Sequence, residues 1–559
     1  MKQALIASLL FLFNASLLPA QHWPTLGGNN LRNGLSNMPG PTGTNALLWS
    51  INSDLPTAWG NAVYLCGNRF VNTRIQLEPA YEGQLECRQL SDGALLWTYG
   101  ESGQIPYAVG FDEHAVYVHD YSNGDFLALD PQDGHLLWRH DEAVYMFGGN
   151  AGVLFACNGD PVVFGKRIDK MTGETVWASD YLIPIAPDGG FAAFNDTYYH
   201  WEGTVFTPKR LIAIDLNSGQ LKYKSDPLPG DPDQENPLTI GPDGAIYITR
   251  DGGPLMAFRD TGSGFDTLWT SNLGAQSRIA TGPDGSLYYF RNNRILRVDA
   301  ASGQPIDTSV QAMAFTSPPL IATDPDGRVY VSNGALGTPG RYYCFSADLS
   351  QILWILHTPT NYYSGPAFGR NGMMIMVGEG TLIRAFHYDG PHAPVADFEA
   401  ENLLVNTGQE VDFEDFSSFS PDSWEWHFPG ATPAVSYEQH PQNIVYDAPG
   451  LYDITLIVSN ALGADTLTRS CHLGVQESSA AGEVFAERVR IFPNPASERV
   501  SIMAPEGSWV RVWSLTGQPV YSGELTNGYL YTGNWPLGGY ILEVEYSGQR
   551  KQAKLLIMR

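Results

Sequence analysis

The chain has 559 residues, of which 59 are acidic and 32 basic, and its formal charge is -27. Nucleic acids and anionic lipid surfaces bind through Lys and Arg that displace counterions, so a surface this acidic excludes both as expected partners. The 59 Gly, 38 Pro, 28 Tyr and 14 Trp indicate many turns that join short strands. The length allows three or four domains, and we expect them to be all-β.

The first twenty residues have the pattern of a secretory signal peptide. A basic start precedes an apolar run over residues 4–18, which is too short to span a bilayer comfortably, and Leu18-Pro19-Ala20 offers small residues for cleavage. We expect a signal peptide over residues 1–20 with cleavage between Ala20 and Gln21. No later apolar run reaches the roughly eighteen residues of a spanning helix. The mature chain is therefore predicted to be exported without a membrane-spanning segment.

One phrase recurs between about residues 45 and 390. It contains an apolar strand, a strand that ends in Asp, a tight turn with Gly, and a strand that ends in an aromatic residue, as in Ala115-Val116-Tyr117-Val118, Phe126–Asp130 and Asp133–Trp138. The aromatic positions are Trp49, Trp97, Trp138, Trp177, Tyr223, Trp269 and Trp354, and one copy has Asp307 there. Their spacing of 38 to 48 residues is typical of β-propeller blades with four strands.

The number of copies predicts how the ring closes. First strands are expected to begin near Ala62, Ala115, Gly152, Thr197, Ala245, Ser286, Arg328 and Met373. The last copy lacks a Trp strand, whereas residues 45–49 form a Trp strand with no blade before it. Pairing the two would close the ring and remove exposed sheet edges. We therefore predict a propeller over residues 21–390 with eight blades, seven being the alternative, in which aromatic side chains pack between neighbours.

The phrase, together with the opening segment His22–Gly34, resembles the PQQ-like propeller repeat. The resemblance implies either a quinone-dependent dehydrogenase or a non-catalytic binding platform, as in an outer-membrane assembly scaffold. The dehydrogenases carry two adjacent cysteines and a calcium ion, and no two cysteines are adjacent in this chain. We therefore expect no cofactor. Calcium at the Asp-rich turns is the alternative to turns that need no ion.

The five cysteines, Cys66, Cys87, Cys157, Cys344 and Cys471, lack the spacing of a thiolate metal site. Cys66 and Cys87 fall on two successive predicted strands. They are expected to be either buried free thiols or a disulfide formed in an oxidising compartment. The odd count leaves at least one cysteine unpaired or joined to another chain.

Residues 391–475 form a second module. Its landmarks are Pro394–Phe398, Trp424–Phe428 and Pro449–Asn460, and they resemble a PKD domain, an immunoglobulin-like β-sandwich. Trp424, Trp426 and Phe428 are expected to face the core, while His427 faces solvent. The sequence His427-Phe428-Pro429-Gly430 lacks the acidic residues common at this place in the family, which argues against a bound ion. The resemblance implies a spacer or a weak adhesion module.

Residues 476–484 have the composition of a linker, and residues 485–559 follow as short alternating strands. This last segment contains Pro493-Asn494-Pro495 and Val510–Gln518, and its final strands include Leu537–Val544 and Lys551–Ile557. It resembles the type A C-terminal sorting domain of type IX secretion cargo, a small β-sandwich. The resemblance implies the type IX secretion machinery as a partner. It also implies a location outside the outer membrane of a Gram-negative bacterium, secreted or on the cell surface.

No common catalytic motif is present: Gly-x-Ser-x-Gly, His-Glu-x-x-His and a glycine-rich phosphate loop are all absent. We therefore assign no catalytic, cofactor-binding or metal-binding residue. The aromatic run Tyr199-His200-Trp201 could stack a sugar ring at a rim of the propeller, and an ordinary strand is the alternative. Two functions remain. We favour a non-enzymatic binding or adhesion protein for a glycan or protein over a hydrolase or lyase acting through the propeller funnel, because the recurring residues already have structural roles.

Overall fold

The computed structural model describes residues 23–557 in part. Outside the description lie residues 58–61, 77–81, 101–102, 141–151, 157, 164, 180–190, 203–207, 230, 233–237, 252–253, 314–319, 334–339, 359–364, 378–379, 401, 478–489, 493–498, 505–507, 515–517, 526–528, 533 and 547–548. The described residues form strands and three short 3-10 helices: η1 (Leu26–Gly28), η2 (Thr44–Ala46) and η3 (Arg370–Gly372). The chain divides into two compact units, with residues 475–559 in the second.

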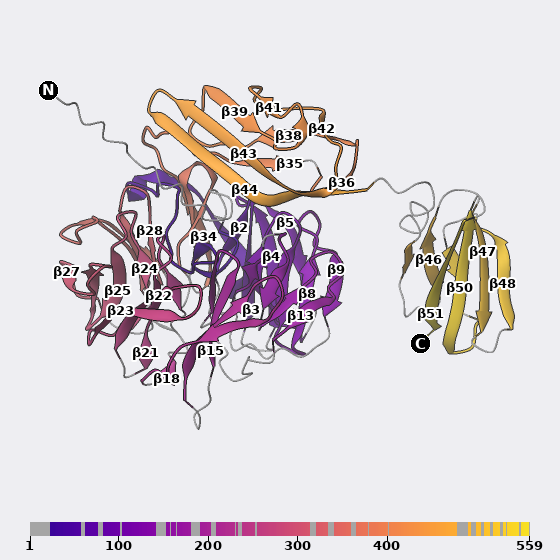
Figure 1. Cartoon of the computed structure of the whole chain (residues 1–559), viewed down its shortest axis with the longest axis horizontal. Helices are drawn as coiled ribbons and strands as arrows, with labels where there is room; N and C mark the ends of the chain where they lie inside the picture. Colours follow the sequence, from indigo (N-terminus) through magenta and orange to yellow (C-terminus); the bar gives the residue numbers. More distant parts are fainter. Residues whose placement is uncertain are drawn as a thin grey trace. The chain divides into compact units, whose positions relative to one another are not determined.

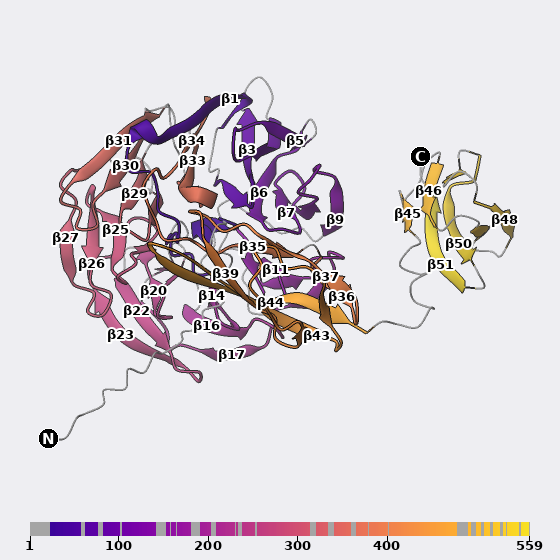
Figure 2. The ribbon, with the colours of Figure 1, turned by 90° about the horizontal axis from the view of Figure 1, so that it is seen from above.

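Within the described residues, eight four-stranded antiparallel sheets surround a common axis (Figure 1, Figure 2). We number these sheets blades 1 to 8. Blades 1 to 4 are β2–β5 (Tyr64–Cys66, Arg69–Gln76, Glu82–Gln89, Leu95–Tyr99), β6–β9 (Pro106–Phe111, Val116–Asp120, Asp125–Leu129, Leu136–His140), β10–β13 (Leu154–Phe155, Pro161–Val163, Lys166–Ile168, Thr175–Ala178) and β14–β17 (Ala192–Phe194, Thr197–Glu202, Arg210–Asp215, Leu221–Lys224). The predicted all-β propeller fold is confirmed.

Blades 5 to 8 are β19, β20, β22 and β23 (Thr239–Ile240, Ile246–Ile248, Leu255–Asp260, Phe265–Ser271), β24–β27 (Ala280–Thr281, Leu287–Arg291, Arg294–Val298, Pro305–Thr308), β28–β31 (Leu320–Thr323, Val329–Asn333, Gly340–Phe345, Ile352–Thr358), and β32, β33, β34 and β1 (Ala367–Gly369, Met373–Val377, Gly380–Phe386, Leu47–Thr57). Strands β18 (Asp231–Pro232) and β21 (Arg250–Asp251) form a separate pair. Eight blades remains our prediction for the complete ring, and these sheets favour it.

Blade 8 is completed by the first strand of the chain. Strand β1 pairs antiparallel with β34, so that Trp49 lies opposite Ala385. This pairing confirms the prediction that the isolated Trp strand completes the last copy. Closure does not remove all the sheet edges, however, because the outermost strand of each blade has a neighbour on one side only. The expectation of an edge-free ring was wrong, since blades are joined face to face and not by further strand pairing.

The innermost strand of the blades was missed in most copies. The predicted starts at Ala115, Thr197, Ala245, Ser286, Arg328 and Met373 fall at or beside the second strand of each blade, and a shorter strand precedes it around the axis. Strands β19 and β24, for example, have two residues each. An alternating pattern needs about four residues to be visible. In these six copies the sequence phrase therefore described the outer three strands, whereas the starts near Ala62 and Gly152 lie beside innermost strands.

The signature tryptophans pack between blades, as predicted. Trp97 of blade 1 donates from Nε1 to the carbonyl of Pro131 in blade 2 at 2.9 Å, and Trp138 of blade 2 donates to Lys170 of blade 3 at 2.7 Å. The turn glycine of the next blade lies against the indole: Gly134 has φ +76°, and a Cβ there would lie 2.6 Å from the Trp97 ring. Tryptophan and glycine of successive copies are thus contact partners.

This contact gives a testable contrast between two turn glycines. Gly303 has φ +69° and a Cβ there would lie 2.5 Å from Trp269, whereas Gly262 has φ +81° and no atom within 4 Å, because Tyr223 replaces the tryptophan of blade 4. Both alanine variants carry the cost of positive φ. We expect Gly303→Ala to lower the free energy of unfolding by a further 1–3 kcal/mol or so, from overpacking. Urea denaturation measures the difference, and equal losses would contradict the inter-blade contact.

Every blade has a β-bulge at the same place. In each described sheet the register of the outermost strand shifts directly before the signature position, so that one residue opposes none on the neighbouring strand. Six of these residues are aliphatic side chains that are 39–49% exposed: Leu48, Leu96, Val176, Leu268, Ile306 and Leu353. A bulge interrupts the ladder and increases the twist of an edge strand.

The PKD module forms a sandwich. Its five-stranded sheet has the order β36 (Leu404–Asn406), β44 (Gly463–Gln476), β43 (Gly450–Asn460), β39 (Ser423–His427) and β41 (Val435–Ser436). It is accompanied by β37 (Glu410–Val411), β42 (Ile444–Tyr446) and β40 (Ala431–Thr432), and by β35 (Phe398–Ala400) with β38 (Phe413–Asp415). Trp426 and Phe428 are fully buried as predicted. Trp424 is half-buried and donates to Asp415, and the His427 side chain is 40% exposed.

The second unit contains two small sheets. One is β45 (Arg490–Phe492), β46 (Arg499–Met503) and β49 (Tyr529–Tyr531); the other is β48 (Pro519–Glu524), β47 (Trp509–Ser514), β50 (Gly538–Tyr546) and β51 (Gln549–Ile557). They share a core of their own, which includes Val512, Leu542 and Leu555. The predicted sorting motif Pro493-Asn494-Pro495 lies outside the described residues, as do Ala20 and Gln21.

Candidate functional site

The opening segment of the chain, residues 23–36, lies across the inner ends of the blades. Backbone hydrogen bonds join it to the innermost strands: Trp23 with Leu65, Pro24 with Phe111, Asn30 with Ala193, Leu31 with Ile240, Asn33 with Thr281, and Gly34 with Thr323, at 2.8–3.1 Å. In blade 3 the side-chain amide of Asn30 donates to the Phe155 carbonyl at 2.8 Å. The opening segment therefore occupies one end of the axis and satisfies backbone groups of seven blades.

A buried arginine anchors this segment. The guanidinium of Arg32 donates to the carbonyls of Leu26 at 3.2 Å and Gly152 at 2.9 Å, and it lies 5.0 Å from the centre of the Phe191 ring. Burial lowers the pKa of Arg32 to about 9, and the nearby charge of Arg278 contributes to the decrease. Sequence patterns did not single out Arg32, because most of its hydrogen-bond partners are backbone carbonyl groups, which leave no signature in the sequence.

A small cavity remains beside this segment. It has a volume of about 40 Å³, and its lining includes Trp23, Leu26, Arg32, Val63 and Arg278. That volume holds about three water molecules, which is too little for a sugar ring or a tricyclic quinone. The residues that line this cavity therefore do not fit the cofactor that this repeat carries in dehydrogenases, and we derive no chemistry through it.

The aromatic run proposed for a rim lies inside the propeller. Tyr199, His200 and Trp201 of β15 are 2–5% exposed. The Tyr199 hydroxyl donates to Asp260 of blade 5 at 2.6 Å, and His200 stacks on Tyr198 with ring centroids 6.0 Å apart. Burial lowers the pKa of His200 to about 4. These residues belong to the core, so the rim interpretation was wrong and the ordinary-strand alternative describes them.

The Asp residues of the turns bond to their own backbone. Asp169, for example, accepts hydrogen bonds from the amides of Met171 at 2.9 Å and Thr172 at 2.8 Å. Such bonds are what Asp supplies in a turn without an ion. Asp130, Asp133 and His135 bring three possible ligand atoms within 4.8 Å of one another. His135 Nδ1 and Asp133 Oδ1 already lie 2.6 Å apart, and we assign no metal site to this cluster.

The described cysteines fall into two groups. Cys66, Cys87 and Cys344 are buried and form no disulfide, so the alternative of a Cys66–Cys87 disulfide was wrong. Burial raises the pKa of Cys87 to about 12, which makes it a poor nucleophile. Cys471 of the PKD domain is disulfide-bonded. Cys157 lies outside the described residues.

Ion pairs join the PKD domain to the propeller. Arg370 of η3 donates from Nε to Asp397 at 3.0 Å, and Arg469 of β44 pairs with both Asp397, at 2.7 Å, and Glu113 in the turn between β6 and β7. The side chains of Asp397 and Arg469 are at most 5% exposed. The PKD domain is thus packed against the propeller, and the expectation of a spacer does not fit these contacts. Residues so far apart in sequence give no local signal of pairing.

Three family models match separate parts of the chain. Residues 41–167 match the model described as outer membrane protein assembly factor BamB, residues 396–472 match the PKD domain, and residues 490–558 match the secretion system C-terminal sorting domain. No protein of curated function matches the sequence.

Solved structures with a similar fold include two propellers. The crystal structure of quinohemoprotein alcohol dehydrogenase from Comamonas testosteroni is 13% identical, with a TM-score of 0.47, over 66% of this chain and 81% of that one. The crystal structure of BamB from Moraxella catarrhalis is 15% identical, with a TM-score of 0.44, over 62% of this chain and 98% of that one.

The sorting domain indicates secretion to the cell surface. In the described part of the chain, no helix has the length and apolar character needed to cross a membrane. The family matches and the fold together identify a propeller of PQQ-like repeats, a PKD domain and a type IX secretion C-terminal sorting domain in one chain.

Proposed function

We propose that the protein is a non-enzymatic binding or adhesion protein that presents its propeller as a recognition platform for a glycan or protein outside the cell. The proposed organisation is a signal peptide over residues 1–20, the propeller over 21–390, the PKD domain over 391–475, a linker over 476–484 and the sorting domain over 485–559. The type IX secretion machinery is the partner for export. The ligand is the partner at the cell surface.

The observation that carries this proposal is the opening segment, residues 23–36, across the inner ends of the blades. Propeller enzymes bring reactive side chains of several blades together near the axis. Here the chain's own backbone fills one end of the axis, and the cavity beside it holds about three water molecules. The recurring Trp, Gly and Asp residues are engaged in contacts between blades and in turns. Binding over a broad surface requires none of these residues.

The mature full-length chain, applied to glycan arrays and to purified surface proteins, tests the proposal. We expect saturable binding to one class of polymer and no release of sugars or peptides from it. Heat-unfolded protein is the control, because a surface interaction of the folded propeller disappears when the blades separate. Product release would support the hydrolase or lyase alternative instead. Equal binding by folded and unfolded chain would also contradict a recognition platform.

A further inference from the structure

Blade 8 differs from the other blades because it joins both ends of the propeller. Strand β1 comes from the beginning of the propeller and β34 from its end, whereas each of the other blades uses successive segments of chain. Only hydrogen bonds and packing hold β1 in place. Elements held by few constraints open first in native proteins. We call the β1–β34 pairing, with the contact of blade 8 to blade 1, the seam.

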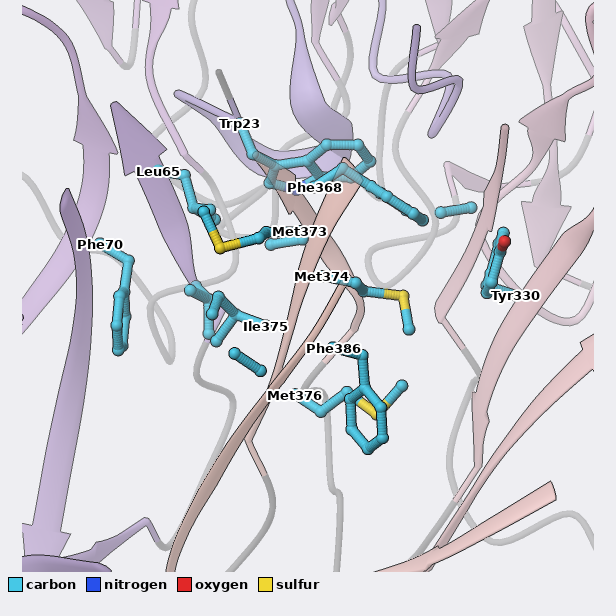
Figure 3. Packing of buried hydrophobic residues seen from close by; sticks show 14 of the residues in the cluster. Trp23, Leu65, Phe70, Tyr330, Phe368, Met373, Met374, Ile375, Met376 and Phe386 are labelled. Atoms are coloured by element: carbon cyan, nitrogen blue, oxygen red, sulfur yellow. The ribbon is translucent and has the colours of Figure 1, made fainter. Parts of the chain in front are cut away.

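The core at the seam contains a deformable side chain. Met373 of β33 is buried there, and Figure 3 shows it beside Leu65 of blade 1, whereas Met374 is directed toward Tyr330 of blade 7 on the other side of blade 8. Methionine fills irregular space but specifies packing weakly. The seam also has the Trp–Gly contact of the other blades, because a Cβ added to Gly93 of blade 1 would lie 2.9 Å from the Trp49 ring. Met373 adds a deformable side chain beside this contact.

The PKD domain contacts blade 8 next to this core. Arg370, in the turn between β32 and β33, contacts Asp397 at 3.0 Å and Glu399 at 2.8 Å. Its guanidinium also lies 4.2 Å from the centre of the Phe416 ring. The amide of Asn371 donates to the Ser418 hydroxyl at 2.9 Å. One turn of blade 8 is thus fixed by several side chains of the PKD domain.

The same domain reaches across blade 1 to blade 2. Asp397 connects Arg370 to Arg469, and Arg469 pairs with Glu113 of blade 2. Above blade 1, a Cβ added to Gly67 would lie 3.3 Å from the Glu399 carboxylate. Burial by itself would lower the pKa of Arg469, but the Glu113 and Asp397 carboxylates outweigh burial, so the pKa is raised. The ion pairs therefore run from one side of the seam to the other in a region with little solvent.

From this geometry we propose that the PKD domain is a clamp that holds the propeller closed across the seam. The propeller surface formed by the β32–β33 turn and the β6–β7 turn is then bound by the chain's own PKD domain. A clamp on the seam opposes opening of β1 from β34, because separation of blades 8 and 1 would break either the pair of Arg370 with Asp397 or the pair of Arg469 with Glu113. Blades 4 to 6, which make none of these contacts, gain nothing from it.

The test uses the full-length mature chain with the variants Glu113→Ala and Arg370→Ala. Each variant removes contacts from the propeller side and leaves the core of the PKD domain intact. Hydrogen–deuterium exchange reports opening strand by strand. In both variants we expect the amides of β1 and β34 to exchange about ten times faster, because local opening of a native protein depends on local contacts. The amides of β15 and β16 in blade 4 should exchange at the unchanged rate.

Arg297→Ala is the matched control. Arg297 pairs with Asp284 at 2.6 Å and Asp307 at 3.1 Å within blade 6, so its loss should affect blade 6 and leave the seam unchanged. Unchanged exchange at β1 and β34 in both clamp variants would overturn the proposal. Equal acceleration across all blades would also overturn it, since that result indicates general destabilisation. None of these readouts depends on a ligand, so they are independent of the proposed binding function.

Discussion

A chain that lacks residues 485–559 is expected to accumulate in the periplasm with its propeller folded. The deleted part matches a secretion system C-terminal sorting domain and forms the greater part of a separate compact unit with its own buried core. Its loss therefore removes the export signal and no contact between blades. Cell fractionation with protease treatment of intact cells measures location, and thermal unfolding of the purified chain measures folding.

Two comparisons sharpen this experiment. The full-length chain expressed at the same level should be accessible to protease on intact cells. A periplasmic reporter fused to residues 476–559 should move to the cell surface, because the signal is expected to act independently of the propeller. Surface exposure of the truncated chain at the level of the full-length chain would refute the sorting role.

Removal of residues 45–50 is expected to destabilise the whole ring. The deletion removes three of the six paired positions between β1 and β34, and with them Trp49, whose Nε1 donates to the Leu90 carbonyl at 3.0 Å. The Trp49 ring also stacks on Phe70 of blade 1 at 6.0 Å. Loss of a packed Trp alone typically costs about 3–5 kcal/mol. For a domain of this size we expect the melting temperature to fall by roughly 5–15 °C.

Point variants separate the contribution of the Trp49 side chain from that of the other residues in the deleted segment. Trp49→Ala should reproduce much of the decrease in melting temperature. Leu48→Ala is the matched control, because Leu48 is 45% exposed at the bulge and its truncation should change stability by less than about 0.5 kcal/mol. A deletion variant that melts at the temperature of the parent chain would show that β1 does not close the propeller.

The sequence predicts those parts of the fold that repeat. Trp97 and Gly134 recur in successive copies because each indole needs a glycine in the next blade, and a requirement met in many copies becomes visible as a period. The same period identified β1 as a strand without a blade, so the closure of the ring was predictable. The eight bulges follow the same period and six carry an exposed aliphatic residue, but such a residue is equally compatible with regular pairing, and the bulges were missed.

Features that occur once were not predictable. Arg32, Arg370 and Arg469 each bond to groups that lie far away in the chain, and no local pattern distinguishes them from other arginines. Most of the innermost strands have only two or three residues, too few to show alternation, and the six residues of β6 are buried on both faces. Tyr199-His200-Trp201 gave the opposite error: aromatic density suggested a ligand surface, but the packing of blades 4 and 5 buries the same rings.

The bulges affect how neighbouring copies of this protein can contact one another on a crowded cell surface. Proteins displayed side by side on a cell envelope collide often, and an unpaired strand edge is a template on which a neighbour can add its own strand. In each described blade the outer edge is interrupted beside its signature position, so no uninterrupted ladder faces outward. We therefore expect the bulges to oppose strand-to-strand association between neighbouring copies of the protein.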